Sequence, residues 1–169
     1  VSGSALDTSY TISLWVKNLS AANGVSVFVF IGTSGSSGGA NAIGFRHGGS
    51  TTSYTLYHYG ASDAGFTGLP NALNTWRHLV AIFDGNTQKV YVDGVLWGTV
   101  TASGKMNIPK NPTFSIGQRH SGGGTTEYLN GYISNPKIYD TALTAEEVNT
   151  LYNMGRCDEG HHMVNFSKT

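Results

Sequence analysis

The feature that most constrains this sequence is a series of short apolar or alternating runs separated by turn residues, at a spacing of about 8–12 positions. In Tyr10–Lys17, Ile12, Leu14 and Val16 share one face of a strand while Trp15 lies on the other face. Apolar residues on both faces indicate a central strand. Val25–Ile31 is almost continuously apolar, which predicts a deeply buried strand. This pattern is typical of a β-sandwich or barrel.

The rest of the chain continues the pattern up to residue 139. Further strands are predicted at Ala42–His47, Ser53–Tyr59, Trp76–Asp84, Gln88–Val92, Val95–Thr101, Thr113–Gly117 and Tyr128–Tyr139. Loops are predicted at Gly32–Gly39, Ala61–Asn74 and Lys105–Pro112. Hairpin turns are expected at Gly85-Asn86 and Asp93-Gly94, where Asp84 and Asp93 are expected to bond their own backbone. Trp76, Val80, Ile82 and Val92 are predicted to lie in the core.

One helix follows the last predicted strand. Thr144 and Glu147 have the spacing of a capping box, and Gly155 is a natural stop, so we expect a helix over Ala145–Met154. The predicted fold is therefore all-β, an antiparallel two-sheet sandwich with one short C-terminal helix. Residues 1–155 form the expected domain and residues 156–169 a tail.

Charge and composition exclude several classes of function. The formal net charge is zero with no basic cluster, which argues against binding to nucleic acid. No apolar run approaches the roughly 20 residues of a membrane helix. Charged residues make up only 12% of the chain, about half the usual share, so its surface is rich in Ser, Thr, Asn and Gly. We expect an extracellular, cell-surface or virion location, and the first residue, Val1, leads us to expect a processed chain or a piece of a larger protein.

Four motifs occur in a familiar order: YTISLWVK at Tyr10–Lys17, WRHLVAIFD at Trp76–Asp84, VYVDG at Val90–Gly94, and the long segment Gly131–Tyr152. Together they resemble the laminin G-like and pentraxin branch of the concanavalin A-like lectin/glucanase superfamily. The resemblance covers roughly residues 5–153. It implies a jelly-roll sandwich and a role in binding glycans or protein surfaces.

The same superfamily includes glucanases, so catalysis has to be weighed. Glycoside hydrolysis needs two carboxyl groups placed across the sugar bond. The glutamates of this chain are Glu127, Glu146, Glu147 and Glu159, and none has an acidic partner two or four residues away on a predicted strand. We therefore predict that the chain is not an enzyme.

By resemblance to laminin G-like domains, a Ca²⁺ site on one rim of the sandwich is a candidate feature. The matching loops are residues 33–41, 60–68 and 118–128. Their side-chain oxygen donors are Asn41, Asp63, Gln118 and Glu127. Ca²⁺ prefers six to eight oxygen ligands, so these residues would need backbone carbonyls and water to complete the site.

Glycan binding calls for an aromatic face that stacks on a sugar ring, with planar polar groups beside it. Two sets of residues meet this requirement, and Trp97 is a third candidate because it follows the Asp93-Gly94 turn. The first set is Arg46, His47, Tyr57, His58 and Tyr59; the second is Arg119, His120 and Tyr128. The alternative is that the tyrosines cover sheet edges and the histidines fill polar positions within the fold.

A different class of function also fits the composition. An uncharged surface suits a structural or assembly subunit of a capsid, fibre or filament that binds no small ligand. In the tail, Val164 and Phe166 share one face of an extended segment. We therefore expect the tail to dock as a strand on its own sheet edge or on that of a second copy. A linker to a further domain is the alternative.

Overall fold

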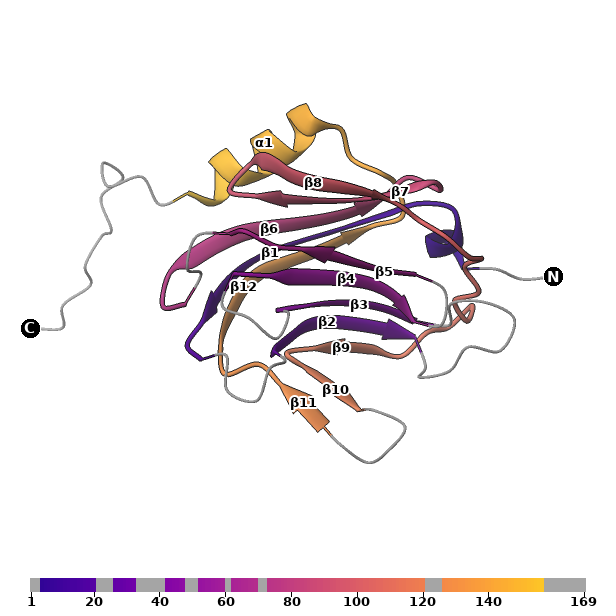
Figure 1. Ribbon diagram of the computed structural model, residues 1–169, viewed down its shortest axis with the longest axis horizontal. Coiled ribbons are helices and arrows are strands. Elements are labelled where there is room, and N and C mark those ends of the chain that lie inside the picture. The colour runs from indigo at the N-terminus through magenta and orange to yellow at the C-terminus, as the bar shows by residue number, and fades with distance from the viewer. Residues whose placement is uncertain are drawn as a thin grey trace, which may run out of the picture.

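The computed structural model describes residues 4–20, 26–32, 42–47, 52–59, 62–69, 73–120 and 126–156 (Figure 1). In these ranges the strands form two five-stranded sheets and a separate two-stranded hairpin, and all strand pairs within them are antiparallel. The predicted all-β, two-sheet jelly-roll sandwich with one short helix is confirmed.

The strands of the first sheet lie in the order β12 (Gly131–Tyr139), β1 (Tyr10–Asn18), β6 (Trp76–Phe83), β7 (Thr87–Val92) and β8 (Val95–Thr101). Those of the second sheet lie in the order β5 (Ser62–Phe66), β4 (Tyr54–Tyr59), β3 (Ala42–His47), β2 (Ser26–Gly32) and β9 (Phe114–Ile116). The hairpin joins β10 (Gln118–His120) to β11 (Thr126–Tyr128). The prediction for Tyr10–Lys17 is confirmed, because β1 has a hydrogen-bonded neighbour on each side.

The main core lies between the two sheets and follows the alternation of each strand. From β1, the side chains of Ile12, Leu14 and Val16 point into this core, at 2% exposure or less. Phe28, Phe45 and other apolar side chains of the second sheet face them. Burial of a large apolar side chain stabilises a fold by about 1.5–3 kcal/mol. The apolar side chains between the two sheets therefore supply most of the hydrophobic free energy of folding.

The helix α1 (Ala145–Gly155) packs on the outer face of the first sheet (Figure 1). Val148 is fully buried there, in a cluster with Val80, Ile82 and Tyr91. The predicted capping box is confirmed, since the side chain of Thr144 accepts the Glu147 N–H and the Glu147 carboxylate accepts the Thr144 N–H. The helix ends at Gly155, one residue beyond the predicted Met154.

Three predictions about individual segments are wrong. The predicted loop 61–74 contains β5, because Ala64 and Phe66 alternate inward and bury against the core. The predicted strand Tyr128–Tyr139 is two strands, because the chain turns after β11, where the Leu129 N–H bonds the Gly117 carbonyl. Trp76 is 43% exposed and not a core residue, because it starts β6 on the outer face.

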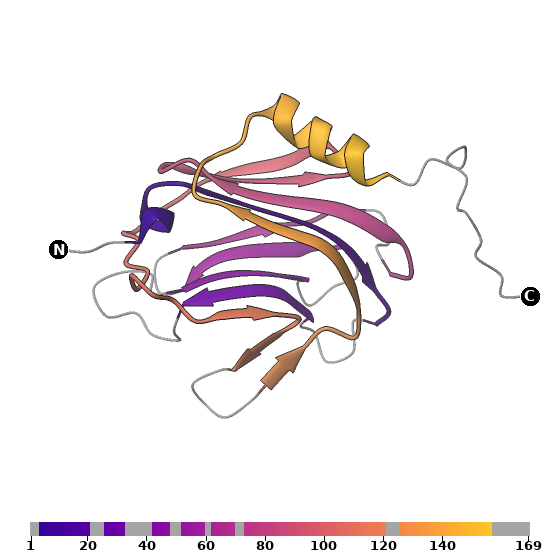
Figure 2. The ribbon, with the colours of Figure 1, turned by 180° about the vertical axis from the view of Figure 1, so that it is seen from behind.

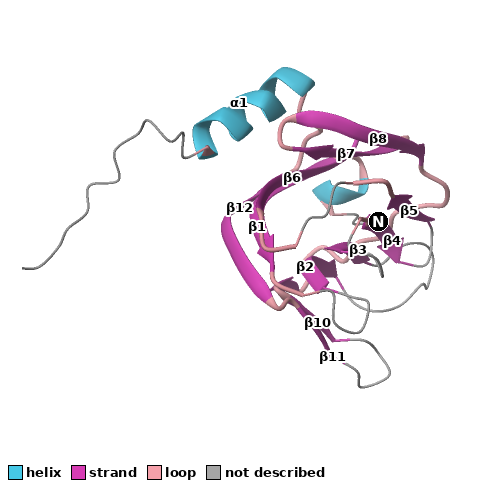
Figure 3. Ribbon diagram, turned by 60° about the vertical axis from the view of Figure 1, so that its left-hand side comes forward, coloured by secondary structure: helices cyan, strands magenta, loops and turns pink. Residues whose placement is uncertain are grey.

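The hairpin β10–β11 and the helix α1 lie on opposite sides of the sandwich. Figures 2 and 3 show α1 over the first sheet, and the hairpin beyond β2 on the far side of the second. No helix among the described residues is long and apolar enough to cross a membrane. The tail predicted to dock as a strand falls outside the described residues from position 157 onward.

Candidate functional site

The outer face of the second sheet carries a row of polar and aromatic side chains. In β4, Leu56 and His58 point inward, so Tyr57 and Tyr59 point outward. In β5, Asp63 takes the outward position directly beside Tyr57, as the strand register shows. The alternation of ordinary strands therefore places these groups on one surface.

Arg46 of β3 joins the same face, and its guanidinium carbon lies 4.8 Å from the centre of the Tyr57 ring. The ring itself lies across Gly44, where a Cβ atom would overlap it. A glycine in the middle of a strand marks such a close approach. Tyr57 is consequently held flat against the sheet, with only 2% of its surface exposed.

The hairpin adds a second arginine. Arg119 of β10 donates a hydrogen bond from Nη1 to the Tyr57 hydroxyl at 2.8 Å. Its Nη2 lies 3.0 Å from Oε2 of Glu127, its register partner on β11, in an ion pair. The guanidinium also lies within 5.9 Å of the ring centres of Phe30, Tyr57 and Tyr59. We refer to Arg46, Tyr57, Tyr59, Asp63, Arg119 and Glu127 as the arginine–tyrosine cluster.

Charges in the arginine–tyrosine cluster balance, with two arginines against two carboxylates. Burial raises the pKa of the Tyr57 hydroxyl, so it is a neutral hydrogen-bonding group at physiological pH. Partial burial also raises the pKa of the Asp63 carboxyl, while Arg46 and Arg119 act in the opposite direction. Among the described residues, Nε of Arg46 and Nε of Arg119 have no hydrogen-bond partner. The arrangement thus combines fixed donors and acceptors with aromatic rings.

The structure brings together members of both predicted glycan-binding sets. Arg46, Tyr57 and Tyr59 from the first set meet Arg119 from the second. The first predicted set is partly wrong, because it grouped residues that point to opposite faces of their strands. His47 and His58 face inward and are 0% and 1% exposed. His58 bonds the Tyr10 hydroxyl at 2.9 Å through Nε2. These two histidines are therefore not accessible to a ligand.

The remaining predicted glycan contacts lie outside the arginine–tyrosine cluster. Trp97 is in the first sheet, on β8, and its indole donates to the Thr67 carbonyl at 3.0 Å. Tyr128 ends β11 and is 61% exposed. His120 lies in β10, but its side chain is outside the described part of the structure.

Among the described residues, the predicted calcium ligands do not form a group of side-chain oxygens that are available to a metal ion. Glu127 is engaged by Arg119, and Asp63 lies in the field of both arginines. The backbone of Gln118 pairs with that of Tyr128 in the hairpin, and Asn41 falls outside the described residues. No group of three or more His, Cys, Asp or Glu side chains in the described ranges could hold a metal ion. Two guanidinium groups near Asp63 and Glu127 disfavour a cation at these two carboxylates.

Comparison with known proteins agrees with the fold. A family model described as the concanavalin A-like lectin/glucanases superfamily, of the laminin G type, matches residues 2–149. The chain belongs to this superfamily. No sequence among the curated proteins compared is similar enough to count as a match.

Several solved structures share the fold. A heptameric SAP-like pentraxin from Limulus polyphemus matches with a TM-score of 0.69 and 22% identity, over 86% of this chain and 70% of the pentraxin. A mutant Trypanosoma rangeli sialidase matches with a TM-score of 0.66 and 23% identity, over 86% of this chain and 23% of the sialidase. The botulinum neurotoxin serotype G binding domain matches with a TM-score of 0.61 and 15% identity, over 89% of this chain and 37% of the domain. The chain thus spans only a part of the sialidase and the toxin domain, and the likeness at these identities concerns the fold.

Proposed function

We propose that this chain is a non-catalytic glycan-binding module of a larger extracellular, cell-surface or virion protein, and that the arginine–tyrosine cluster holds the sugar. The observation that carries the proposal is the convergence of Arg46, Tyr57, Tyr59 and Arg119 from three separate strands on one face. A binding module agrees with the superfamily and with the pentraxin and toxin binding domain among the structural matches.

Each accessible group of the arginine–tyrosine cluster has a role in this proposal. Tyr59 is 36% exposed and offers the face of its ring to the C–H groups of a sugar. Asp63, the exposed register partner of Tyr57, accepts hydrogen bonds from sugar hydroxyls, while Arg46 donates them. Tyr57 and Arg119 are mostly buried and hold the accessible groups in place. Less conformational entropy is therefore lost when a ligand binds.

Two features support a non-catalytic role. The sequence lacks the paired carboxylates of the glucanases. Glu127 is held by Arg119, whereas Glu146 and Glu147 lie on α1, on the opposite side of the sandwich. The two carboxylates of the arginine–tyrosine cluster, Asp63 and Glu127, lie among its arginines, and Arg119 already pairs with Glu127, so our proposal gives them no role as the acid and base of a glucanase.

A glycan microarray tests the proposal, with wild type compared with Tyr59→Ala and with Trp97→Ala as a matched aromatic control. We expect wild type and the Trp97 variant to bind at least one glycan, and the Tyr59 variant to lose about tenfold in affinity for it. Chromatography of the bound glycan after overnight incubation should show no cleavage product. If every glycan that binds wild type also binds the Tyr59 variant at wild-type affinity, or if a bound glycan is cleaved, the proposal is wrong.

Assembly without a small ligand is the second candidate, and the β9 edge of the second sheet, which has no further strand partner in the described part of the chain, favours it. β9 pairs with β2 on one side, and its Phe114 and Ile116 are 48% and 43% exposed. An exposed apolar edge strand is a route to pairing with another chain. Light scattering after gel filtration distinguishes the two functions: a stable oligomer that Ile116→Lys converts to monomer supports assembly, whereas a monomer at high concentration speaks against it.

A further inference from the structure

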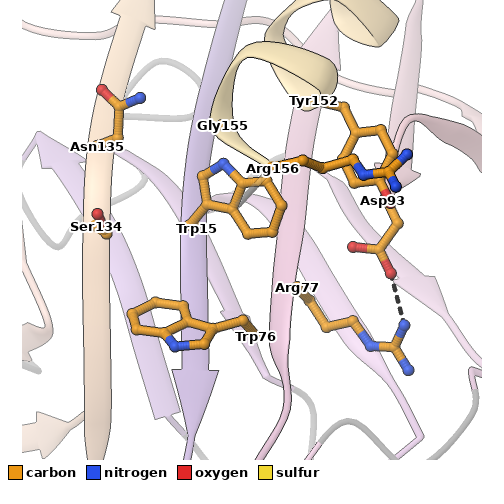
Figure 4. Close-up of a pocket in the computed structure, with 9 residues that line it drawn as sticks. All are labelled: Trp15, Trp76, Arg77, Asp93, Ser134, Asn135, Tyr152, Gly155 and Arg156. Carbon is orange, nitrogen blue, oxygen red and sulfur yellow. Dashed lines mark hydrogen bonds and ion pairs between the residues drawn. The ribbon is translucent and has the colours of Figure 1, made fainter. Parts of the chain in front are cut away.

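A groove lies on the other side of the sandwich, where α1 stops. Val148 anchors the helix over Val80 and Ile82, and the helix ends at Gly155 before it has covered the whole outer face of the first sheet. Beyond this end is an open cavity of about 650 Å³ (Figure 4). Its lining residues are Trp15, Trp76, Arg77, Asp93, Ser134, Asn135, Tyr152, Gly155 and Arg156. This volume lies within the roughly 300–1,000 Å³ of small-molecule sites.

The floor of the groove is aromatic. In register, Trp76, Lys17 and Tyr132 form one row across β6, β1 and β12. The rings of Trp76 and Tyr132 are 6.4 Å apart between centroids, and these residues are 43% and 58% exposed. The next row contains Trp15, which stacks on Tyr152 of the helix at 5.8 Å. Exposed aromatic side chains beside a concave surface are typical of a place of contact with another molecule.

Polar groups flank the aromatic floor on two sides (Figure 4). On one side, Arg77 and Asp93 form an ion pair of 2.6 Å, and Asp93 also accepts the His78 N–H at 2.9 Å. Asp93 was expected to bond its own backbone, and the structure shows that it instead ties the β7–β8 turn to β6. Ser134 and Asn135 of β12 lie on the opposite side. The groove therefore presents hydroxyl, amide, carboxylate and guanidinium groups around a flat apolar surface.

Close packing at the helix end keeps the groove open and rigid. A Cβ atom at Gly155 would overlap the indole nitrogen of Trp15. At Gly94, whose φ is +81°, a Cβ atom would lie 2.9 Å from Cδ1 of Tyr152. These contacts hold the helix against the sheet at both the Trp15 row and the β7–β8 turn. A site made of strands and a docked helix loses little conformational entropy when it binds a ligand.

We infer that this groove is a second carbohydrate site, which takes the pyranose ring of a glycan. A pyranose presents an apolar C–H face that fits the Trp76 ring, and a rim of hydroxyls that act as both donors and acceptors. The flanking groups match this rim, because Asp93 and Asn135 accept hydrogen bonds while Arg77, Ser134 and Asn135 donate them. The groove is separate from the arginine–tyrosine cluster, so the two sites would give the module two contacts on opposite sides.

The test compares Trp76→Ala with Trp97→Ala, a second exposed tryptophan that lies outside the groove and is 38% exposed. A microarray of neutral and sialylated oligosaccharides supplies the probe, and calorimetry with the strongest ligand of each site gives affinities. We expect Trp76→Ala to lower the affinity for at least one glycan about tenfold or more. Trp97→Ala should leave the affinity for the same glycan within about twofold of wild type. Tyr132 lies beside the groove, outside its lining, and its ring contacts that of Trp76, so Tyr132→Ala gives a second variant with the same expected direction.

Tyr59→Ala separates this inference from the function proposed above. A glycan of the groove should bind the Tyr59 variant normally and lose affinity only with Trp76→Ala and Tyr132→Ala. If every glycan that binds wild type also binds both groove variants at wild-type affinity, and both variants melt as wild type does, the inference is wrong. An array on which no glycan binds would overturn it as well.

Discussion

Two buried histidines make the stability of this fold sensitive to mild acid. His58 lies in the main core between Tyr10 and Phe83, with its ring 4.8 Å from that of Phe83. His78 lies under Trp15, at 5.2 Å between ring centres, and bonds the Ser13 hydroxyl at 3.0 Å. Burial lowers the pKa of each histidine to about 4.

The sign of the effect follows from these shifts. An unfolded chain binds a proton at each histidine below a pKa of about 6.5, whereas the folded chain does so only below about 4. Stability is therefore fully present above pH 6.5 and is lost as the pH falls toward 4. At 1.36 kcal/mol for each unit of pKa difference, each histidine lowers the free energy of unfolding by about 2 kcal/mol between pH 7 and pH 5.

Urea denaturation at pH 7, 6 and 5 measures this loss. Wild type should lose about 4 kcal/mol over the interval, and His58→Gln about half as much, because one of the two titrating groups is gone. Most carboxylates titrate below this interval, so they contribute little to the difference. Parallel stability profiles for wild type and His58→Gln would refute the reasoning.

Three further predictions concern the helix and the calcium ligands. Thr144→Ala should lower the free energy of unfolding by about 0.5–2 kcal/mol, since the Glu147 N–H loses its cap; thermal melting checks this, and an unchanged melt would contradict it. Gly155→Ala should destabilise by about 1–3 kcal/mol in the same assay through overlap with Trp15, and a gain in stability would mean that the helix end is not packed there. Millimolar Ca²⁺ should leave the melting temperature unchanged, because Arg119 engages Glu127. A rise that Asp63→Asn abolishes would restore Asp63 as a metal ligand.

The fold could be predicted because its signals are local. Alternation in β1 and the Asp93-Gly94 turn define strands and hairpins without any knowledge of tertiary contacts. β5 was missed for the same reason, since Ser62–Phe66 contains only two inward side chains and a glycine. Its strand character comes from pairing with β4, which is a tertiary contact.

The candidate sites show where local reasoning ends. Arg46 and Tyr57 were identified by residue type alone. Because successive side chains of a strand point to opposite faces, the sequence could also have shown that His47 and His58 lie on the other face. The approach of Arg119 to Tyr57 depends on how the hairpin folds over β2, which no local pattern encodes. The groove at Trp76 was missed because its exposure depends on where α1 stops along the outer face of the first sheet.

The most direct test of the central claim is a titration of the ¹⁵N-labelled chain with the strongest glycan whose affinity falls in Tyr59→Ala, followed by two-dimensional NMR. The account predicts that, with Trp76→Ala to silence the groove, the largest amide shifts occur on β3, β4 and β5 around Arg46, Tyr59 and Asp63. Shifts confined to the β9 edge, or no shifts at saturating glycan, would contradict it.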